Sequence, residues 1–513
     1  MTVGATRHRP LGGSFLHRSL HHIGEHALAF HHSPRLHHQG RVTRATGSAR
    51  NPWLVLPVLV AGFFMILIDT TIVNVAIPTI MRALSASLDQ VLWVINAYTL
   101  VLAVFLIPAG RLGEIYGQRT LFIIGVLLFT GASIACGLSQ SSGQLLAARA
   151  VQGLGAAALT PQTLALLSEV FPHEKAGLAV GIWGACAGLA AAAGPLLGGL
   201  IVHALSWRWI FLVNVPLGFA VVIAALLLVP NLRPSRDHAV DVVGVTALSG
   251  ALVALVFGLD EGNRYQWGRF LGPVTVWEVS VAGVLLLGAF VLWERRHRQP
   301  LIPTVLFLDR TFSLMNAIGA AVAFALVGFF FMYPLYLQGV LHATPLTTGL
   351  VLTPLPLAAM VTAPIAGHLV ERVPGRLLVG IGSLVFALGI LLAALFAGPS
   401  SSVSGLIPAL LLAGLGMGMT FAPLTAMAMA HIEPQMSGVA SGVLNTTRQV
   451  GSVLGAAVVG AILELRLGAG LQGEGVNSSF VDAMRPALVT LVVVLMLAAA
   501  GSLVLRPQPA ASQ

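Results

Sequence analysis

One carboxylate, that of Asp69, interrupts an apolar run from Trp53 to Met81 in which no other residue is charged. An ionised side chain at the centre of a membrane helix costs about 3 kcal/mol on insertion scales, so carboxylates at that depth tend to face a cavity and to have a function. A low dielectric also disfavours the charged form of a carboxylate. Asp69 is therefore a candidate proton carrier. The alternative is that its side chain only hydrogen-bonds a neighbouring helix.

The guanidinium of Arg149, in the segment RAVQGLGAA, is the group best placed to act with this carboxylate. If the two residues lie in membrane helices of opposite direction, they lie at similar depths and a contact between them is possible. An opposite charge favours the ionised carboxylate whereas burial favours the neutral acid, so opening and closing this pair would bind and release a proton. Gln152 and Gly153 lie one turn further along the same helix face.

Arg448, in NTTRQVGSVLG, is a second arginine inside an apolar segment, and no acid is expected at its level. It either bonds carbonyl groups at a helix end or meets substrate or Asp69 in one conformation, and the sequence leaves both open. Aromatic residues could bind flat cations through cation–π contacts. The candidate residues of a substrate cavity are Asn74, Tyr98, Gln152, Asn445, Arg448 and Gln449.

The composition places these side chains in a membrane protein. Of 513 residues, 57% are hydrophobic and only 9% are charged, with a mean hydropathy of +0.90, whereas about a quarter of residues are charged in soluble proteins. The single lysine, Lys175, follows Glu174 and cannot belong to a nucleotide-binding P-loop, which excludes an ATP-driven pump formed by this chain alone. Cys136 and Cys186 lie in apolar segments and indicate neither a disulfide framework nor a metal site.

A membrane-spanning helix needs about 20 mostly apolar residues, and fourteen windows meet this condition. They are 53–81, 90–110, 120–139, 144–167, 177–203, 208–229, 240–259, 273–293, 312–337, 346–370, 376–397, 405–430, 437–463 and 484–505. An even number of spans places both termini on one side. That side and its loops hold 19 of the 27 Lys and Arg residues, so the positive-inside rule makes both termini cytoplasmic.

An internal repeat organises the windows. The stretch Pro108–Arg119, PAGRLGEIYGQR, returns 257 residues later as Ile365–Arg376, IAGHLVERVPGR. Paired halves are the sequence sign of a secondary transporter with a substrate site near the bilayer midplane. The predicted organisation, an all-α polytopic membrane protein, has a disordered, basic, His-rich cytoplasmic tail (1–51), a six-helix bundle (52–230), two inserted helices (231–300), a second six-helix bundle (301–506) and a short tail (507–513).

Together these segments resemble the major facilitator superfamily, specifically its fourteen-helix drug:proton antiporter branch of the EmrB/QacA type. LIDTTIVNVAIP resembles that family's first-helix signature, through Asp69, Thr71, Asn74 and Pro78. The loop GRLGEIYGQR resembles the superfamily's gating loop, which holds the outward-facing state, through Gly110, Arg111, Gly113, Glu114, Gly117 and Arg119. Its charged residues would pair with the neighbouring bundle. Glu114 occupies a position where the family usually has Asp, and Gln118 one where it usually has a basic residue. Both differences would weaken the hold of this loop on the outward-facing state.

GPLLGG resembles the family's antiporter motif, through Gly194, Pro195, Gly198 and Gly199, with Ala190 at the position of the first glycine. The resemblance also gives Arg149 a part in proton coupling. It implies a proton-coupled antiporter in the plasma (inner) membrane that exports amphiphilic, cationic or aromatic drugs by alternating access, with no cofactor and no metal. The expected partners are a small-molecule substrate, protons and the lipid bilayer, with no nucleic acid, and the expected state is a monomer.

The nearest alternative is export of an endogenous metabolite, such as an antibiotic, a lipid or an amino acid, on the same fold. An enzyme is not expected, because no intramembrane constellation of His, Asp and Glu supports one.

Overall fold

The chain is a bundle of helices in the computed structural model, which describes residues 51–231, 241–262, 265–297, 304–370, 372–430, 432, 436–467 and 476–505. The predicted basic tail lies outside these residues except for Asn51, and so does the predicted tail 507–513. The disorder of these tails and the domain boundaries therefore stay predictions.

Seven helices precede the predicted insertion: α1 (Pro52–Leu84), α2 (Leu88–Tyr116), α3 (Gln118–Leu138), α4 (Ser142–Val170), α5 (His173–Ala204), α6 (Trp209–Leu212) and α7 (Asn214–Leu228). Polar side chains cap their first turns where the sequence supplies them. The side chain of Asn51 accepts a hydrogen bond from the backbone of Trp53, and that of Ser141 accepts one from Gln144. Such caps satisfy backbone N–H groups that have no partner within the helix.

The insertion contains α8 (Val242–Glu261), α9 (Val276–Glu294) and, between them, a short antiparallel ribbon. The ribbon pairs β1 (Arg269–Leu271) with β2 (Val274–Thr275), with Arg269 opposite Thr275 and Leu271 opposite Val274. This ribbon lies in a connecting loop, where turn residues and β-branched residues permit a hairpin, and the fold as a whole is helical as predicted.

The remaining elements are the 3₁₀ turns η1 (Thr304–Leu308) and η2 (Ser404–Leu406) and the helices α10 (Arg310–Gly339), α11 (Pro345–Leu352), α12 (Pro354–Leu369), α13 (Gly375–Phe396), α14 (Ile407–Met429), α15 (Ser437–Leu467) and α16 (Val476–Val504). Each of the fourteen predicted windows thus holds helix. Two windows are divided, at Val213 and at Thr353. In both cases a proline follows in the next turn, where it removes a backbone donor.

Eleven helical stretches within the described residues are long and apolar enough to cross a membrane by length and composition. Helix α4 is not among them, and α5 and α8 contribute only the shorter apolar stretches Gly188–Ala204 and Val242–Gly258. The number of fourteen spans therefore stays a prediction. Helix α4 carries Arg149, Gln152 and Gln162, all at most 2% exposed, so its polar groups face protein.

The internal repeat is visible as equivalent contacts in the two halves. A Cβ added at Gly153 would lie 2.5 Å from the carbonyl oxygen of Tyr98, and one at Gly414 would lie 2.1 Å from that of Leu355. Both pairs are close approaches of two helix backbones, which small residues permit. Tyr98 and Leu355 are 257 residues apart, the spacing of the sequence repeat.

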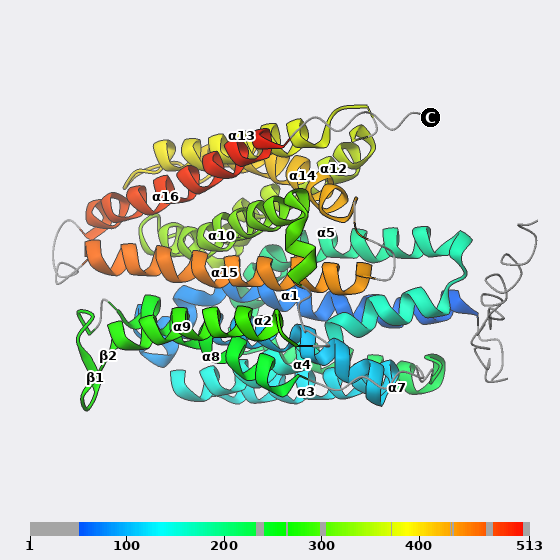
Figure 1. The fold of residues 1–513 in the computed structure, drawn as a ribbon. Coiled ribbons are helices and arrows are strands. Elements are labelled where there is room, and N and C mark those ends of the chain that lie inside the picture. Colours follow the sequence, from blue (N-terminus) through cyan, green and yellow to red (C-terminus); the bar gives the residue numbers. More distant parts are fainter. Residues whose placement is uncertain are drawn as a thin grey trace, which may run out of the picture. The chain divides into compact units, whose positions relative to one another are not determined.

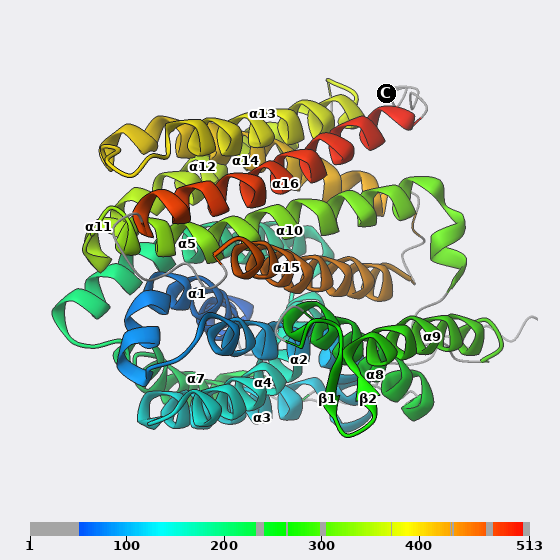
Figure 2. The same ribbon diagram turned by 90° about the vertical axis from the view of Figure 1, so that its left-hand side faces the viewer.

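The halves meet closely at the end of the bundle where α1 ends, here called the far end. The apolar core of the carboxyl-terminal half includes Val75 of α1 and Leu92 of α2. Gln338 of α10 donates a hydrogen bond to the carbonyl oxygen of Val75 at 2.8 Å. Figures 1 and 2 show α15 beside α2, and a Cβ at Gly460 of α15 would lie 2.3 Å from the Leu92 side chain. The far end is therefore closed between the halves.

Candidate functional site

The two charged residues singled out from the sequence, Asp69 of α1 and Arg149 of α4, form an ion pair. Asp69 is completely buried and Arg149 is 2% exposed. Arg149 Nη1 donates to Asp69 Oδ2 and also to Gln152 Oε1, the latter at 2.7 Å. Residues 80 positions apart in the chain are thus brought together at one depth, as the opposite directions of their helices suggested.

The second oxygen of the carboxylate accepts two further hydrogen bonds. Gln152 Nε2 donates to Asp69 Oδ1 at 2.9 Å, and Asn214 Nδ2 of α7 donates to the same oxygen at 3.4 Å. Gln152 Nε2 also lies 2.9 Å from Ser133 Oγ of α3. Side chains of α3, α4 and α7 therefore all contribute to the hydrogen-bond network around this carboxylate of α1.

The guanidinium of Arg149 is fixed from its other side by aromatic rings and a carbonyl group. Its Cζ lies 4.1 Å from the centre of the Tyr98 ring and 5.8 Å from that of Phe211. Arg149 Nε donates to the carbonyl oxygen of Val94 at 3.4 Å. Cation–π contacts of this kind are strongest where water is excluded. The Tyr98 hydroxyl is buried and has no hydrogen-bond partner. Tyr98 therefore contacts Arg149 through its ring and not through its hydroxyl.

Breaking such a buried pair from one side costs about 3–5 kcal/mol, because an uncompensated charge is left in a low dielectric. Asp69 is not exposed in this conformation. The surrounding helices therefore close the ion pair off from solvent.

The predicted substrate-cavity residues divide into two sets. Those of the amino-terminal half are buried: Tyr98 and Gln152 belong to the ion-pair network, and Asn74, 6% exposed, donates to the carbonyl oxygen of Thr70 in its own helix. Those of the carboxyl-terminal half are open, since Asn445 is exposed and Arg448 and Gln449 are partly exposed. In this conformation only the second set has substantial exposed side-chain surface.

Most of the predicted gating loop is helical, because Gly110, Arg111 and Gly113 lie in α2 and Arg119 lies in α3. Gly117 alone turns the chain between the two helices. Its φ of 97° is one that side chains other than glycine rarely adopt. A Cβ at Gly113 would lie 2.1 Å from Gln162 Oε1, whereas at Gly110 the nearest atom is 3.7 Å away on Pro161. A side chain at Gly113 would therefore displace the Gln162 amide, whose Nε2 donates to the carbonyl oxygen of Ala109 at 2.8 Å.

Arg119 of this loop donates to the carbonyl oxygen of Leu226 in α7 at 2.6 Å. Its partner therefore lies in its own half, and the expectation of a partner in the neighbouring bundle was wrong for Arg119 in this conformation. Arg376, its counterpart in the repeat, donates to the carbonyl oxygen of Leu505 at 2.8 Å. Arg111 is partly exposed, and the Glu114 side chain lies outside the described part of the structure. A role as a latch stays a prediction.

The predicted antiporter motif packs against both halves. A Cβ at Gly194 would lie 1.8 Å from the Thr71 hydroxyl oxygen, and one at Gly198 would lie 2.8 Å from the carbonyl oxygen of Ile72. Helix α5 is therefore held tightly on α1, two residues from Asp69. The other face of this motif contacts α11, because a Cβ at Gly199 would lie 2.4 Å from the carbonyl oxygen of Pro345.

A glycine of α11 completes this contact between the halves. A Cβ at Gly349 would lie 2.2 Å from the carbonyl oxygen of Pro195. The close helix approach expected of the motif is present, and it forms part of the far-end closure.

Sequence reasoning missed three residues of the ion-pair site: Ser133, Asn214 and Phe211. Two of them could have been found from the sequence, because each is a polar residue within a predicted apolar window. Ser133 lies in the window 120–139 and Asn214 in the window 208–229. Cys136, expected to fill the core, is buried and lies 3.6 Å from Gln152 Oε1. Within the described ranges, no group of three or more His, Cys, Asp or Glu side chains is arranged to hold a metal ion.

An internally repeated bundle of apolar helices with a buried ion pair is the architecture of a multi-pass membrane transporter. The chain belongs to the Major Facilitator Superfamily, whose family model matches residues 59–456. Members of this family are transporters rather than enzymes. The predicted superfamily is thereby confirmed, while the fourteen-helix EmrB/QacA type stays a prediction.

Similar proteins include exporters and resistance proteins. The chain is 38% identical over 412 residues to "Multidrug resistance protein Stp" of Mycobacterium tuberculosis (strain CDC 1551 / Oshkosh), covering 80% of this chain and 76% of that one. It is 36% identical over 431 residues to "Tetracenomycin C resistance and export protein" of Streptomyces glaucescens, covering 83% and 78%. Its fold resembles a bacterial homolog to the human lysosomal transporter Spinster in an inward-facing and occupied conformation, with a TM-score of 0.62, 19% identity and coverage of 88% and 95%.

Proposed function

We propose that this transporter is a proton-coupled antiporter of the fourteen-helix EmrB/QacA type that exports amphiphilic aromatic or cationic drugs by alternating access. The observation that carries the proposal is the fully buried ion pair of Asp69 and Arg149. The names of the multidrug resistance and antibiotic export relatives support drug efflux. The distribution of arginines supports a plasma-membrane protein with both termini cytoplasmic. We expect it to act as a monomer.

In the proposed cycle, the carboxylate is ionised while Arg149 is in contact with it, because an opposite charge favours the charged form. Rocking of the halves would separate the pair and open the far end. Asp69, still surrounded by apolar groups, would then favour the neutral acid and bind a proton from outside. Return of Arg149 would release this proton toward the cytoplasm. Since α5 contacts both α1 and α11, movement of the halves would be transmitted to the helix that carries Asp69.

The energetics follow from the number of coupling acids. If Asp69 alone couples, one proton replaces one monovalent cation, and the exchange is electroneutral. It then runs on the pH difference, worth about 1.4 kcal/mol per pH unit. A membrane potential imposed on vesicles at equal pH would not drive export of a cation under this scheme, and potential-driven export would rule out strict one-for-one exchange.

Export of an endogenous metabolite is the second candidate, and one comparison favours it. A relative 36% identical to this chain carries the name of a resistance and export protein for tetracenomycin C. The chemistry of transport would be the same, so genes for the biosynthesis of a metabolite beside the gene for this transporter would favour this alternative over general drug efflux.

The proposal is tested by dye accumulation in inside-out vesicles whose lumen is acidified. Wild-type protein is expected to accumulate dye, and Asp69→Asn is expected to insert normally and to lose proton-driven accumulation. Asp482→Asn is the matched control, because Asp482 is 73% exposed and forms only an exposed pair with Arg485. Undiminished accumulation by Asp69→Asn would remove this residue from the coupling mechanism.

A further inference from the structure

Arg448 is a second guanidinium inside the helical bundle, near the middle of α15. Its Nη2 donates to the hydroxyl of Thr425 in α14 at 2.8 Å, and its Cζ lies 5.0 Å from the centre of the Phe421 ring. The hydrogen bond is therefore made to a side-chain hydroxyl, neither to a carbonyl group at a helix end nor to Asp69, the two partners within the protein that the sequence left open. Arginine has five N–H donors, and only one of them is used in this hydrogen bond. The other donors can bind a further acceptor.

The two deep arginines differ in how their charge is balanced. Arg149 is paired with Asp69 and is 2% exposed. Arg448 has no carboxylate within ion-pair distance among the described residues, and its Nε is buried without a hydrogen-bond partner. Charged side chains within a membrane are paired or mark the path of a substrate or ion. The positive charge of Arg448 therefore has no anionic partner among the described residues.

Arg448 is partly exposed, and its neighbour on α10 has no side chain. Gly319 of α10 faces it without a side chain, and a Cβ there would lie 3.5 Å from Arg448 Nε. Asn445 is exposed one turn earlier on α15, and Gln449 is partly exposed. The backbone of α15 is fixed against α10 just beyond this point, since a Cβ at Gly451 would lie 2.3 Å from the carbonyl oxygen of Ala320. The partly exposed residue Arg448 thus carries its charge on a rigid support.

We propose that Arg448 binds the anionic oxygen, a carboxylate or phenolate, of a flat aromatic substrate, with Phe421 contacting the rings. An arginine binds such oxygens through paired N–H donors, and a phenyl ring beside it accepts a planar ring system. This inference rests on the proposed export function and chooses the aromatic anion as the substrate class, in place of the cation favoured by the family resemblance.

The charge of the substrate changes what drives transport. Export of one anion in exchange for one entering proton moves two positive charges inward, whereas export of one cation for one proton moves none. A membrane potential that is negative inside would therefore drive export of an aromatic anion even without a pH difference. The same potential would leave exchange of a monovalent cation unaffected.

The proposal is tested by equilibrium binding of two dyes to the purified protein in lipid nanodiscs at pH 8. Fluorescein is an anion at this pH and rhodamine 123 is a cation, and both have a xanthene ring system. Fluorescence anisotropy is expected to show tighter binding of fluorescein. Arg448→Gln is expected to weaken fluorescein binding about tenfold or more, as expected for loss of a hydrogen bond to a charged group, without weakening rhodamine 123 binding.

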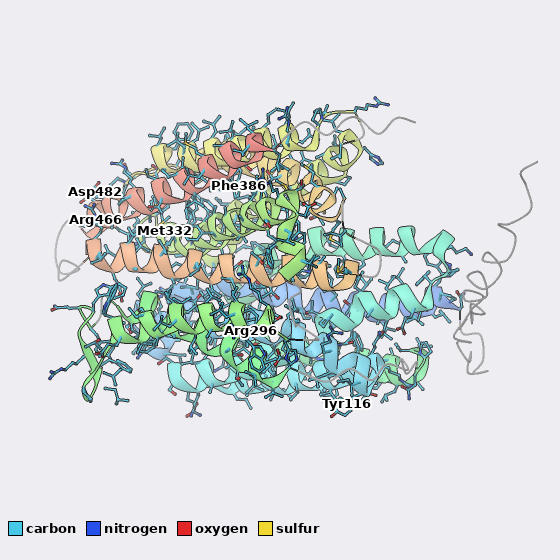
Figure 3. The ribbon with its side chains drawn as sticks, in the orientation of Figure 1. Tyr116, Arg296, Met332, Phe386, Arg466 and Asp482 are labelled. Carbon is cyan, nitrogen blue, oxygen red and sulfur yellow. The ribbon has the colours of Figure 1, made fainter. Side chains whose placement is uncertain are left out.

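Two further variants complete this experiment. Arg448→Lys keeps the positive charge and is expected to restore part of the fluorescein affinity, and it allows the test even if the glutamine variant does not fold. Arg466→Gln is the matched control, since Arg466 is an exposed arginine at the far end of the same helix (Figure 3). Equal weakening of both dyes by Arg448→Gln, or no weakening of fluorescein, would overturn the proposal.

Binding without a gradient separates this proposal from the proposed function. Asp69→Asn is expected to retain fluorescein binding and to lose only proton-driven transport. If Asp69→Asn transported normally while Arg448→Gln lost fluorescein selectively, proton coupling at Asp69 would fail and the anion site would stand.

Discussion

Removal of one charge from the buried ion pair should destabilise the protein much more than removal of both. Asp69→Asn leaves Arg149, 2% exposed, without its counterion, and Arg149→Gln leaves the fully buried carboxylate without its guanidinium. Breaking a buried pair from one side costs about 3–5 kcal/mol. The variant Asp69→Asn retains an acceptor for Gln152 and Asn214, so we expect a loss of about 3 kcal/mol in the free energy of unfolding, the lower end of this range.

The double variant Asp69→Asn/Arg149→Gln contains no uncompensated charge. Its amide groups can hydrogen-bond each other and the existing neighbours, so its stability should lie above that of either single variant. The coupling energy from the double-mutant cycle should then exceed about 3 kcal/mol, because the double variant loses less stability than either single variant. Neither the single variants nor the double variant should support proton-driven efflux, because each lacks at least one member of the pair.

The assay is unfolding in mixed micelles with a rising fraction of SDS, followed by tryptophan fluorescence, for the four proteins of the cycle. Asp482→Asn serves as the control, because its partner Arg485 lies 3.6 Å away in an exposed pair and such pairs contribute little. Asp482 lies near the end of the bundle that also carries Arg466 (Figure 3). Additive losses in the double variant would refute the interpretation of Asp69 and Arg149 as one coupled unit.

Three further predictions concern single contacts. Tyr98→Phe keeps the ring beneath the guanidinium and should leave the pH profile of efflux unchanged, whereas Tyr98→Leu removes the contact at 4.1 Å and should shift it. Gly199→Leu cannot fit beside Pro345, 2.4 Å from the added Cβ, so it should open the far end and increase maleimide labelling of a cysteine introduced at Val75. Arg119→Gln should lower the free energy of unfolding by about 1–2 kcal/mol, through loss of its hydrogen bond to a carbonyl group of α7.

Each of these predictions has an opposing result. Equal effects of the phenylalanine and leucine variants on the pH profile would show that the ring does not position the guanidinium. Unchanged labelling in Gly199→Leu would show that the contact between α5 and α11 does not limit opening. Unchanged stability in Arg119→Gln would assign no structural role to that hydrogen bond in this conformation.

The sequence determined the class and much of the helical layout, because apolar runs of sufficient length have few alternatives in a membrane. It also selected Asp69 and Arg149, since a charge within such a run is too costly to be incidental. The repeat spacing of 257 residues fixed which loops and helices would be equivalent, as Arg119 and Arg376 illustrate by bonding carbonyl groups in their own halves.

Only the tertiary structure decided which helix faces meet. Asn214 and Ser133 join the Asp69 site through the packing of α7 and α3, and no spacing in the chain predicts contacts across 145 residues. The structure likewise showed that Tyr98 and Gln152 belong to the ion pair, and that Arg448 lacks a carboxylate among the described residues. A sequence shows where a membrane protein places its charges, but pairing depends on helix rotation and depth, which are set by packing between helices.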